Sequence, residues 1–361
     1  MYACDVASAP GRAGACGARA ARRRAPRARP SPGPRDWLMW AGADLVCRHF
    51  RSLSTAGGGG VGHLREMGEA KGFRAFSTEP HSDVSLEEAA PVGQAASDCS
   101  VVPEQRSPGG GDLKLLSGSF YLPHPDKAET GGEDAHFICA EEQAIGVADG
   151  VGGWADQGID SGRYARQLMS NSAAAIREQA KGSVDTGAVL EKAYAKTREM
   201  GSSTACIIAL TDQGVHAVNI GDSGFIVVRD GSTIFRSPVQ QHEFNMPYQL
   251  DSRGYGDLPS AAQVFNIPVQ PGDVIVMGTD GLFDNLYTNE ISGVVVYATR
   301  AKLEPQVAAQ KIVELASQRA LDKKQQSPFS TAAQQSGYRY NGGKLDDISV
   351  VVSYVTASSR D

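Results

Sequence analysis

Acidic residues stand at the ends of apolar runs that lie far apart along this chain. Three such pairings occur: residues 144–148 before Asp149, residues 274–277 before Asp280, and residues 348–352 after Asp346 and Asp347. Each run has the length and composition of a buried strand. Because the end of one strand lies beside the start of the next in an antiparallel sheet, we expect these carboxylates to meet at one edge.

Carboxylates that gather at one edge repel one another unless a cation holds them. Hard divalent cations such as Mg2+ and Mn2+ prefer oxygen ligands of this kind. An Asp-Gly pair taken alone is typical of a turn. Because the pattern recurs after several buried strands, it favours a metal centre, with Asp149, Asp280 and Asp346 as the first candidate ligands.

Further acidic residues extend this pattern. Glu133 and Asp134 precede a strand-like run, and a tight turn joins that run to the strand that ends before Asp149. The two strands form a hairpin, so Glu133 and Asp134 at its start lie at the same end as Asp149. Asp284 lies four residues after Asp280, and a helical turn there places both carboxylates on one side. Gly150 lacks a side chain, which lets the backbone approach a cation and offer a carbonyl oxygen.

Composition limits the partners of this chain. Residues 1–60 carry ten arginines and three aspartates, a net charge of +7, whereas the remainder carries 25 basic and 38 acidic residues, a net charge of −13. An acidic body is not suited to nucleic acid, and no apolar stretch reaches the ~20 residues of a membrane helix. The six cysteines form no C-x-x-C pair, so Cys139 and Cys206 are expected to be buried apolar residues rather than zinc or redox groups.

The first 80 residues have the composition of a targeting segment, rich in Arg, Ala, Ser and Gly and poor in acids. Arginines followed by small hydroxyl residues at 48–55 and 73–78 resemble the ends of mitochondrial presequences. We therefore expect import into the mitochondrion, with the chloroplast as the alternative. The arginines at 22–24 are also open to interpretation as a nuclear signal or a solvated tail. Residues 81–112 are predicted to be a disordered linker.

From residue 113 onward the pattern predicts one folded domain, residues 113–356, with a tail at 357–361. Strands are expected at 135–140, 143–148, 204–210, 215–220, 225–229, 264–267, 274–277 and 348–355. Helices are expected at 161–180, 188–200 and 306–321, the last with Val307, Ile312, Leu315 and Ala316 on one face. Consecutive strands joined by short turns, with helices in pairs, indicate an α+β fold with antiparallel sheets and helices on their outer faces.

Six short motifs stand in the order found in one protein family. They are residues 133–137, 148–154, 201–205, 219–223, 278–284 and 346–350. With these motifs in register, the chain resembles the metal-dependent serine/threonine protein phosphatases of type 2C over about residues 113–355. Gly131 and Gly132 before Glu133, together with residues 327–329 and 342–344, make it similar to the mitochondrial branch of that family.

The resemblance implies an α-β-β-α sandwich, two antiparallel sheets flanked by helices, with a two-metal centre at one edge. Asp149 would bridge two Mg2+ or Mn2+ ions. Asp280 and Asp346 would complete the site of one ion. Glu133 and the carbonyl of Gly150 would serve the other, largely through water.

The resemblance also bears on neighbouring residues and on the reaction. Asp284 resembles the ligand of a weaker third metal ion, and Thr204 and Asp222 match positions near it, although Asp222 is equally suited to supporting loops. Two cations that share a water would lower its pKa and make hydroxide available for in-line attack on phosphorus, so no phosphoenzyme would be needed.

Two positions depart from the common family pattern. The arginine that usually grips phosphate four residues before Glu133 is absent, because Glu129 stands there, and Lys127 is the nearest candidate replacement. The histidine that often follows the bridging Asp-Gly is replaced by Val151. Protonation of the leaving group must then come from water at the metal centre or from another residue, for which His124 is a candidate.

Two other functions compete with this interpretation. Residues 279–284 resemble the motif of haloacid-dehalogenase phosphatases, but those enzymes need an acid where Leu282 stands and an alternating strand-helix order. A weakly active or inactive relative that binds a partner is the second alternative. Because the carboxylates are intact, we predict a phosphoprotein phosphatase, with Asp149, Asp280, Lys127 and His124 as its catalytic residues.

No interaction domain is visible, so a monomer is expected, and substrate choice is predicted to lie in residues 244–262 and 325–344.

Overall fold

The computed structural model describes residues 113–358. The predicted targeting segment, residues 1–80, and the predicted linker, residues 81–112, lie outside these residues, and both stay predictions. Among the described residues, none of the helices is long and apolar enough to cross a bilayer. The domain predicted over residues 113–356 begins with β1 and ends with β14, whose last residue, Ala357, lies one position beyond the predicted boundary.

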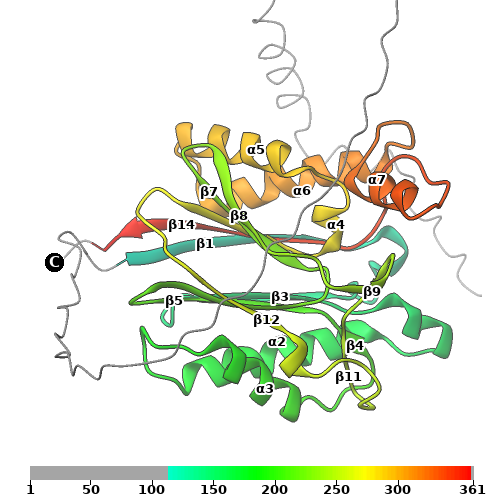
Figure 1. Cartoon of the computed structure of the whole chain (residues 1–361), viewed down its shortest axis with the longest axis horizontal. Helices are drawn as coiled ribbons and strands as arrows, with labels where there is room; N and C mark the ends of the chain where they lie inside the picture. The colour runs from blue at the N-terminus through cyan, green and yellow to red at the C-terminus, as the bar shows by residue number, and fades with distance from the viewer. Residues whose placement is uncertain (1–112, 359–361) are drawn as a thin grey trace, which may run out of the picture. The chain divides into compact units, whose positions relative to one another are not determined.

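Two five-stranded antiparallel sheets stack face to face (Figure 1). Sheet I has the order β1 (Leu113–Leu122), β14 (Ile348–Ala357), β13 (Val274–Gly278), β7 (Gly224–Arg229) and β8 (Ser232–Arg236). Sheet II has the order β12 (Gln263–Ile267), β6 (Gly214–Ile220), β5 (Ala205–Thr211), β3 (Ala144–Asp149) and β2 (Asp134–Cys139).

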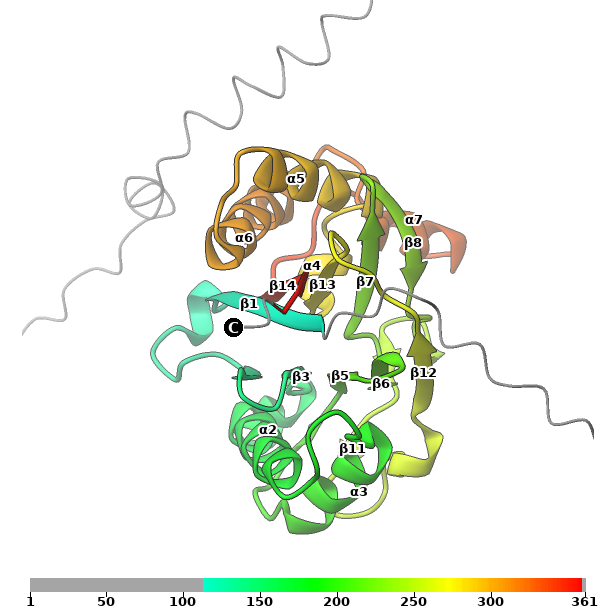
Figure 2. The ribbon, with the colours of Figure 1, turned by 90° about the vertical axis from the view of Figure 1, so that its left-hand side faces the viewer.

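Helices cover the outer face of each sheet, as Figure 2 shows from the side. Sheet I carries α5 (Thr288–Arg300) and α6 (Pro305–Leu321), and sheet II carries α2 (Ser161–Arg177) and α3 (Thr186–Lys196). The shorter helices are α4 (Asp280–Phe283), α7 (Pro328–Gln335), η2 (Pro125–Lys127), η3 (Gly152–Gln157) and η4 (Pro259–Ala261). Short strands pair as β4 (Ser202–Ser203) with β11 (Leu250–Asp251) and β9 (Gln241–Glu243) with β10 (Met246–Pro247). The predicted α-β-β-α sandwich is confirmed.

Alternation along the strands explains the three apolar layers. In β13 every residue is buried. Val274 and Val276 face the helices α5 and α6, whereas Ile275 and Met277 join the core between the sheets. Because both faces of each sheet are covered, the strands appear in the sequence as continuous apolar runs rather than as alternating ones.

The eight predicted strands are confirmed to within one or two residues, but other elements escaped prediction. β1 lacks a clear pattern because most of its residues are only partly buried. α5 contains three consecutive valines, which are typical of a strand, yet forms a helix that packs on sheet I. α7 lies within the segment 325–344, where no helix is predicted from the sequence.

Three details of the predicted helices are wrong. The helix predicted over residues 161–180 ends three residues earlier, at Arg177. Val307 does not share the buried face of α6, because it is 37% exposed while Ala308 and Ile312 are buried. The helix predicted over residues 188–200 ends earlier, at Lys196. It ends there because the side-chain oxygen of Gln167 accepts hydrogen bonds from the next backbone amides, Arg198 N at 2.5 Å and Glu199 N at 2.8 Å.

We expect the core between the sheets to dominate stability. Phe225 is fully buried there, and its ring centroid lies 5.2 Å from that of Phe235 and 6.1 Å from that of Phe265. Phe225→Ala should lower the free energy of unfolding by about 3–5 kcal/mol, because it leaves a cavity between two sheets that cannot close it. Ile234→Ala, at a 45% exposed position, is the control and should cost less than about 1 kcal/mol in the same urea titration. Equal effects of the two changes would contradict this packing.

Candidate metal centre

The acidic residues predicted from the sequence meet at one edge of the two sheets. Asp134 at the start of β2 lies opposite Asp149 at the end of β3 in the antiparallel register. Asp280 begins α4 two residues after the end of β13, and Asp346 lies two residues before the start of β14. Since β13 and β14 are antiparallel neighbours, these two positions share an edge. The charges of Asp280 and Asp346 both act on Asp149, as expected of one cluster.

A hydrogen bond joins the two sheets at this edge. Thr279, between β13 and α4, donates through Oγ1 to Asp134 Oδ2 at 2.8 Å. The same Oγ1 accepts from the backbone N of Ser349 in β14 at 3.1 Å. The backbone of Asp134 is therefore part of sheet II, while its side chain is hydrogen-bonded to the end of sheet I.

Burial makes these carboxylates costly to ionise. Burial first, and then the charge of Asp280, raises the pKa of Asp149 well above its ordinary value. Burial and the charge of Asp347 raise the pKa of Asp134 in the same way. The pKa of Asp346 rises to about 6 through burial and the charge of Asp280. Such groups retain protons unless a cation offsets their charge.

The residues present fit a divalent cation. Asp134 Oδ1 and Asp280 Oδ1 are buried without a hydrogen-bond partner, a costly state that a cation would relieve. Gly150 lies so close to its neighbours that a Cβ would stand 2.7 Å from Ser161 O and 2.8 Å from Glu133 O. The donors are all oxygens, which suits Mg2+ or Mn2+. Within residues 113–358, no three acidic, His or Cys side chains already surround one point as ligands do.

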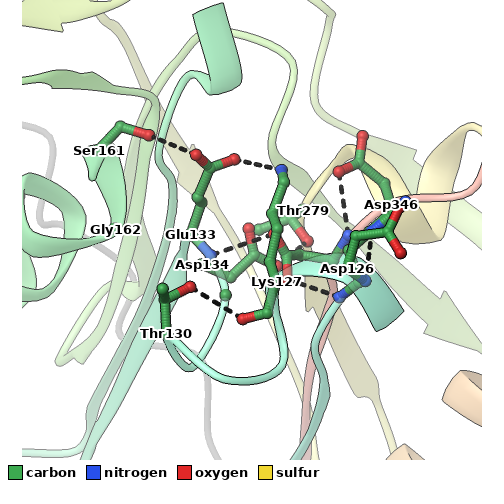
Figure 3. Close-up of polar contacts among 12 residues, drawn as sticks. Asp126, Lys127, Thr130, Glu133, Asp134, Ser161, Gly162, Thr279 and Asp346 are labelled. Carbon is green, nitrogen blue, oxygen red and sulfur yellow. Dashed lines mark hydrogen bonds and ion pairs between the residues drawn. The ribbon is translucent and has the colours of Figure 1, made fainter. Parts of the chain in front are cut away.

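Lys127 occupies one side of the cluster. Its ammonium contacts Glu133 Oε2 and lies 3.6 Å from Asp347 Oδ2. The other oxygen of Glu133 accepts a hydrogen bond from Ser161 Oγ at 3.1 Å, so both oxygens of this carboxylate are engaged (Figure 3). Burial alone would lower the pKa of Lys127, but the contact with Glu133 outweighs it and the pKa is raised. Lys127 is therefore a charged group beside Glu133, and its role as the phosphate-binding cation stays a prediction.

Asp347 holds the segment that carries Lys127. This carboxylate is almost fully buried, and its Oδ1 accepts from Tyr121 Oη at 3.0 Å and from His124 N at 2.8 Å. Its Oδ2 accepts from Glu133 N at 3.1 Å. Sequence reasoning gave Asp347 no role. The available signal was its place beside Asp346, because neighbouring side chains point to opposite sides and a second buried carboxylate needs partners of its own.

Lys344 occupies the other side of the cluster and was also missed as a site residue. Its Nζ lies 2.5 Å from Asp280 Oδ2, 2.9 Å from Asp284 Oδ2 and 3.3 Å from Asp346 Oδ2. Burial raises the pKa of Asp280, but the charge of Lys344 outweighs this effect and the pKa is lowered. Asp280 and Asp284 share a side because α4 makes the predicted turn, in which Asp284 N donates to Asp280 O at 2.7 Å.

Asp222 and Asp284 are buried carboxylates at the margin of the cluster. Burial and the charge of Asp280 raise the pKa of Asp222 to about 7. Burial also raises the pKa of Asp284 to about 7, against the opposing charge of Lys344. Asp222 Oδ2 accepts from Gln241 Nε2 at 3.0 Å, a contact that supports the β9 segment. Asp222 therefore has the loop-supporting contact expected from the sequence.

Two other predicted residues have structural contacts. His124 Nδ1 accepts from Asp126 N at 3.1 Å and so caps η2, while its own backbone N binds Asp347. Its role as an acid stays a prediction. Thr204 Oγ1 accepts from Asp149 N at 3.0 Å, which fixes the backbone at the end of β3. All six predicted metal ligands lie along this one edge, and Gly150 N donates to Glu133 O at 3.1 Å.

The fold and this edge define a class of protein: an α-β-β-α sandwich with a carboxylate cluster suited to divalent cations. Comparisons with known proteins identify the family. The family model of stage II sporulation protein E matches residues 141–355. Probable protein phosphatase 2C 55 of Arabidopsis thaliana is 70% identical over 249 residues, which cover 69% of this chain and 53% of that protein. The chain thus spans about half the length of this relative.

Two further relatives are matched over most of their length. Probable protein phosphatase 2C 26 of Arabidopsis thaliana is 36% identical over 273 residues, which cover 72% of this chain and 90% of that protein. The X-ray structure of the photosystem II phosphatase PBCP superposes with a TM-score of 0.63 at 35% identity, covering 68% of this chain and 100% of that one. This chain belongs to the protein phosphatase 2C family.

The buried charge of Asp222 has a measurable consequence for the chain stripped of metal by a chelator. Its pKa of about 7 in the folded state exceeds the ~3.9 of an unfolded chain. The folded chain therefore holds the proton at pH 5 and gives it up, at a cost in stability, by pH 8. Asp222→Asn retains the oxygen that accepts from Gln241 but carries no charge. We expect this variant to be more stable than wild type at pH 8. In urea titrations, the difference in unfolding free energy between variant and wild type should increase by about 1–3 kcal/mol from pH 5 to pH 8.

The exposed turn residue Asp212 supplies the control for this experiment. Asp212→Asn makes the same chemical change at an exposed position and should leave the unfolding free energy close to that of wild type in the same titrations. A gain for Asp222→Asn that does not depend on pH would contradict a buried carboxyl that retains its proton.

Proposed function

We propose that this chain is a metal-dependent phosphatase that hydrolyses phosphoserine and phosphothreonine in proteins at a centre of two Mg2+ or Mn2+ ions. One observation carries the proposal: acids from four distant segments meet at one edge, where Asp134 Oδ1 and Asp280 Oδ1 are buried without partners. A chain retains such a cluster against its cost in stability where the charge serves function. The family relationship supports the same reaction.

The residues of the cluster have separate tasks in this proposal. Asp149, Asp280 and Asp346 would hold the cations, and Glu133 and the carbonyl of Gly150 would complete their surroundings. The bound cations would lower the pKa of a water and offset charge on the phosphoryl oxygens.

The protein's own groups orient this chemistry. Thr204 and Thr279 fix the backbone of Asp149 and the side chain of Asp134. Lys127, held against Glu133, presents a positive charge at the same edge for a phosphate oxygen. His124 is retained as a candidate acid for the leaving group, with water as the alternative.

Removing the central carboxylate should abolish hydrolysis without unfolding the chain. Asp149→Asn should lower kcat/KM for a phosphothreonine peptide in Mn2+ at least about 100-fold, because it withdraws charge from the cation site. The metal-free variant should be no less stable than wild type, because the change relieves repulsion in the cluster. EDTA should remove the wild-type activity, and Mn2+ should restore it.

Asp212→Asn is the matched control, an Asp-to-Asn change in an exposed turn, and should leave turnover unchanged. Hydrolysis that persists in Asp149→Asn would contradict the proposed function. Binding of Mn2+ by wild type without turnover would favour the alternative, a phosphatase-like protein that acts by binding a partner.

Lys127 should act on phosphate binding. Lys127→Met should raise KM for the phosphopeptide about tenfold, the loss expected for one hydrogen bond to a charged group. Lys127→Arg should restore most of the affinity, because a guanidinium also donates to phosphate. The measurement is the separation of KM from kcat at saturating Mn2+, with Mn2+ affinity determined in parallel. A variant that loses Mn2+ affinity at unchanged KM would show that Lys127 only positions Glu133.

A further inference from the structure

A lysine ammonium lies within the acidic cluster, at a place where a cation would otherwise bind. Lys344 Nζ is 2.5 Å from Asp280 Oδ2, 2.9 Å from Asp284 Oδ2 and 3.3 Å from Asp346 Oδ2. The three carboxylates come from the start of α4, from the residue after α4 and from the loop before β14. Only 17% of the Lys344 side chain is exposed.

The surrounding fold holds Lys344 in this position. The side-chain amide of Asn285 brackets its backbone, donating to Lys344 O at 2.8 Å and accepting from Lys344 N at 3.0 Å. The ammonium also lies 5.1 Å from the centroid of the Phe329 ring. Gly343 packs so tightly against α6 that a Cβ would stand 2.1 Å from Arg319 O. The lysine is therefore fixed at both backbone and side chain, unlike a surface lysine that is free to swing away.

An ammonium and a metal ion cannot share this place. A divalent ion beside Asp284 would need oxygen ligands at about 2.0–2.6 Å, with carboxylate oxygens and water among them. The ammonium already engages the Oδ2 atoms of Asp280 and Asp284. Asp280 Oδ1 remains without a partner. One carboxylate can thus serve Lys344 through one oxygen and a metal ion through the other.

We propose that Lys344 is a built-in cation that takes the place of a third metal ion beside Asp284, so that the chain binds two divalent ions and no third. The proposal rests on the two-metal function proposed above. It replaces the expectation that Asp284 is a metal ligand and makes Asp284 a partner of Lys344. Because this charge belongs to the chain, neither dilution nor a chelator removes it.

The test counts Mn2+ ions bound per full-length chain, by equilibrium dialysis with metal analysis at saturating Mn2+. Wild type and Asp284→Asn should bind the same number of ions, because Asp284 binds no metal while Lys344 is present. Lys344→Met should bind one ion more than wild type, because it frees three carboxylates. The double variant Lys344→Met/Asp284→Asn should lose that additional ion.

Lys323→Met is the matched control. Lys323 lies just after α6 and donates through Nζ to Gly343 O at 3.4 Å rather than to the cluster. The Lys323→Met variant loses the same formal charge as Lys344→Met and should bind as many ions as wild type. An extra ion in Lys323→Met would show that net charge, not the position of Lys344, sets the number, and would overturn the proposal.

Two other results would also overturn it: fewer ions in Asp284→Asn than in wild type, or the same number in Lys344→Met as in wild type. If Lys344→Met does not fold, as circular dichroism would reveal, Asp284→Asn decides alone, and an unchanged count supports the proposal. A wild-type chain that binds no Mn2+ would contradict the proposed function itself, and this proposal with it. A wild-type chain that binds more ions than Asp284→Asn would contradict this proposal alone.

Discussion

Repulsion among buried carboxylates is the constraint on which this structure depends. Sheet II brings Asp134 and Asp149 to one edge, and sheet I brings Asp280 and Asp346 to the same edge. Elsewhere the two sheets pack through a core of apolar side chains. At this edge they are joined by the hydrogen bond from Thr279 to Asp134. The fold therefore concentrates like charges where its apolar packing ends, and either bound protons or nearby positive charge must offset their repulsion.

Two lysines supply part of that balance from opposite sides. Lys127 serves Glu133 and Asp347, and Lys344 serves the carboxylates around α4. Neither lysine engages the unpartnered oxygens, Asp134 Oδ1 and Asp280 Oδ1. The two lysines thus lie at the margins of the carboxylate cluster, and the oxygens in its interior stay available to divalent ions. This division explains how an acidic centre can persist in the metal-free protein while still favouring cations.

Local patterns predicted what depends on strand ends. Asp149 and Asp280 were found because an apolar run predicts a strand, and antiparallel order then brings strand ends together. The same reasoning does not reach Lys344, whose position is set by Asn285 and by packing against α6, both distant in sequence. It failed for α5 as well, since Val294 and Val295 favour strands and only the contact with sheet I makes them helical. The meeting of strand ends was therefore predictable from local patterns, whereas contacts that loops and helices make with distant elements were not.

The retention of Asp222 and Asp284 argues that the centre was shaped by function. Each is a buried carboxylate whose pKa is raised to about 7, so each costs stability in the metal-free chain at neutral pH. An asparagine at position 222 would still accept the hydrogen bond from Gln241, and without Lys344 nothing would require a charge at 284. Stability alone therefore favours neutral residues at both positions. Acidic residues at this edge are therefore explained by the cations that their negative charge attracts. One of these cations is the Lys344 ammonium, and the others are the divalent ions that would bind beside it.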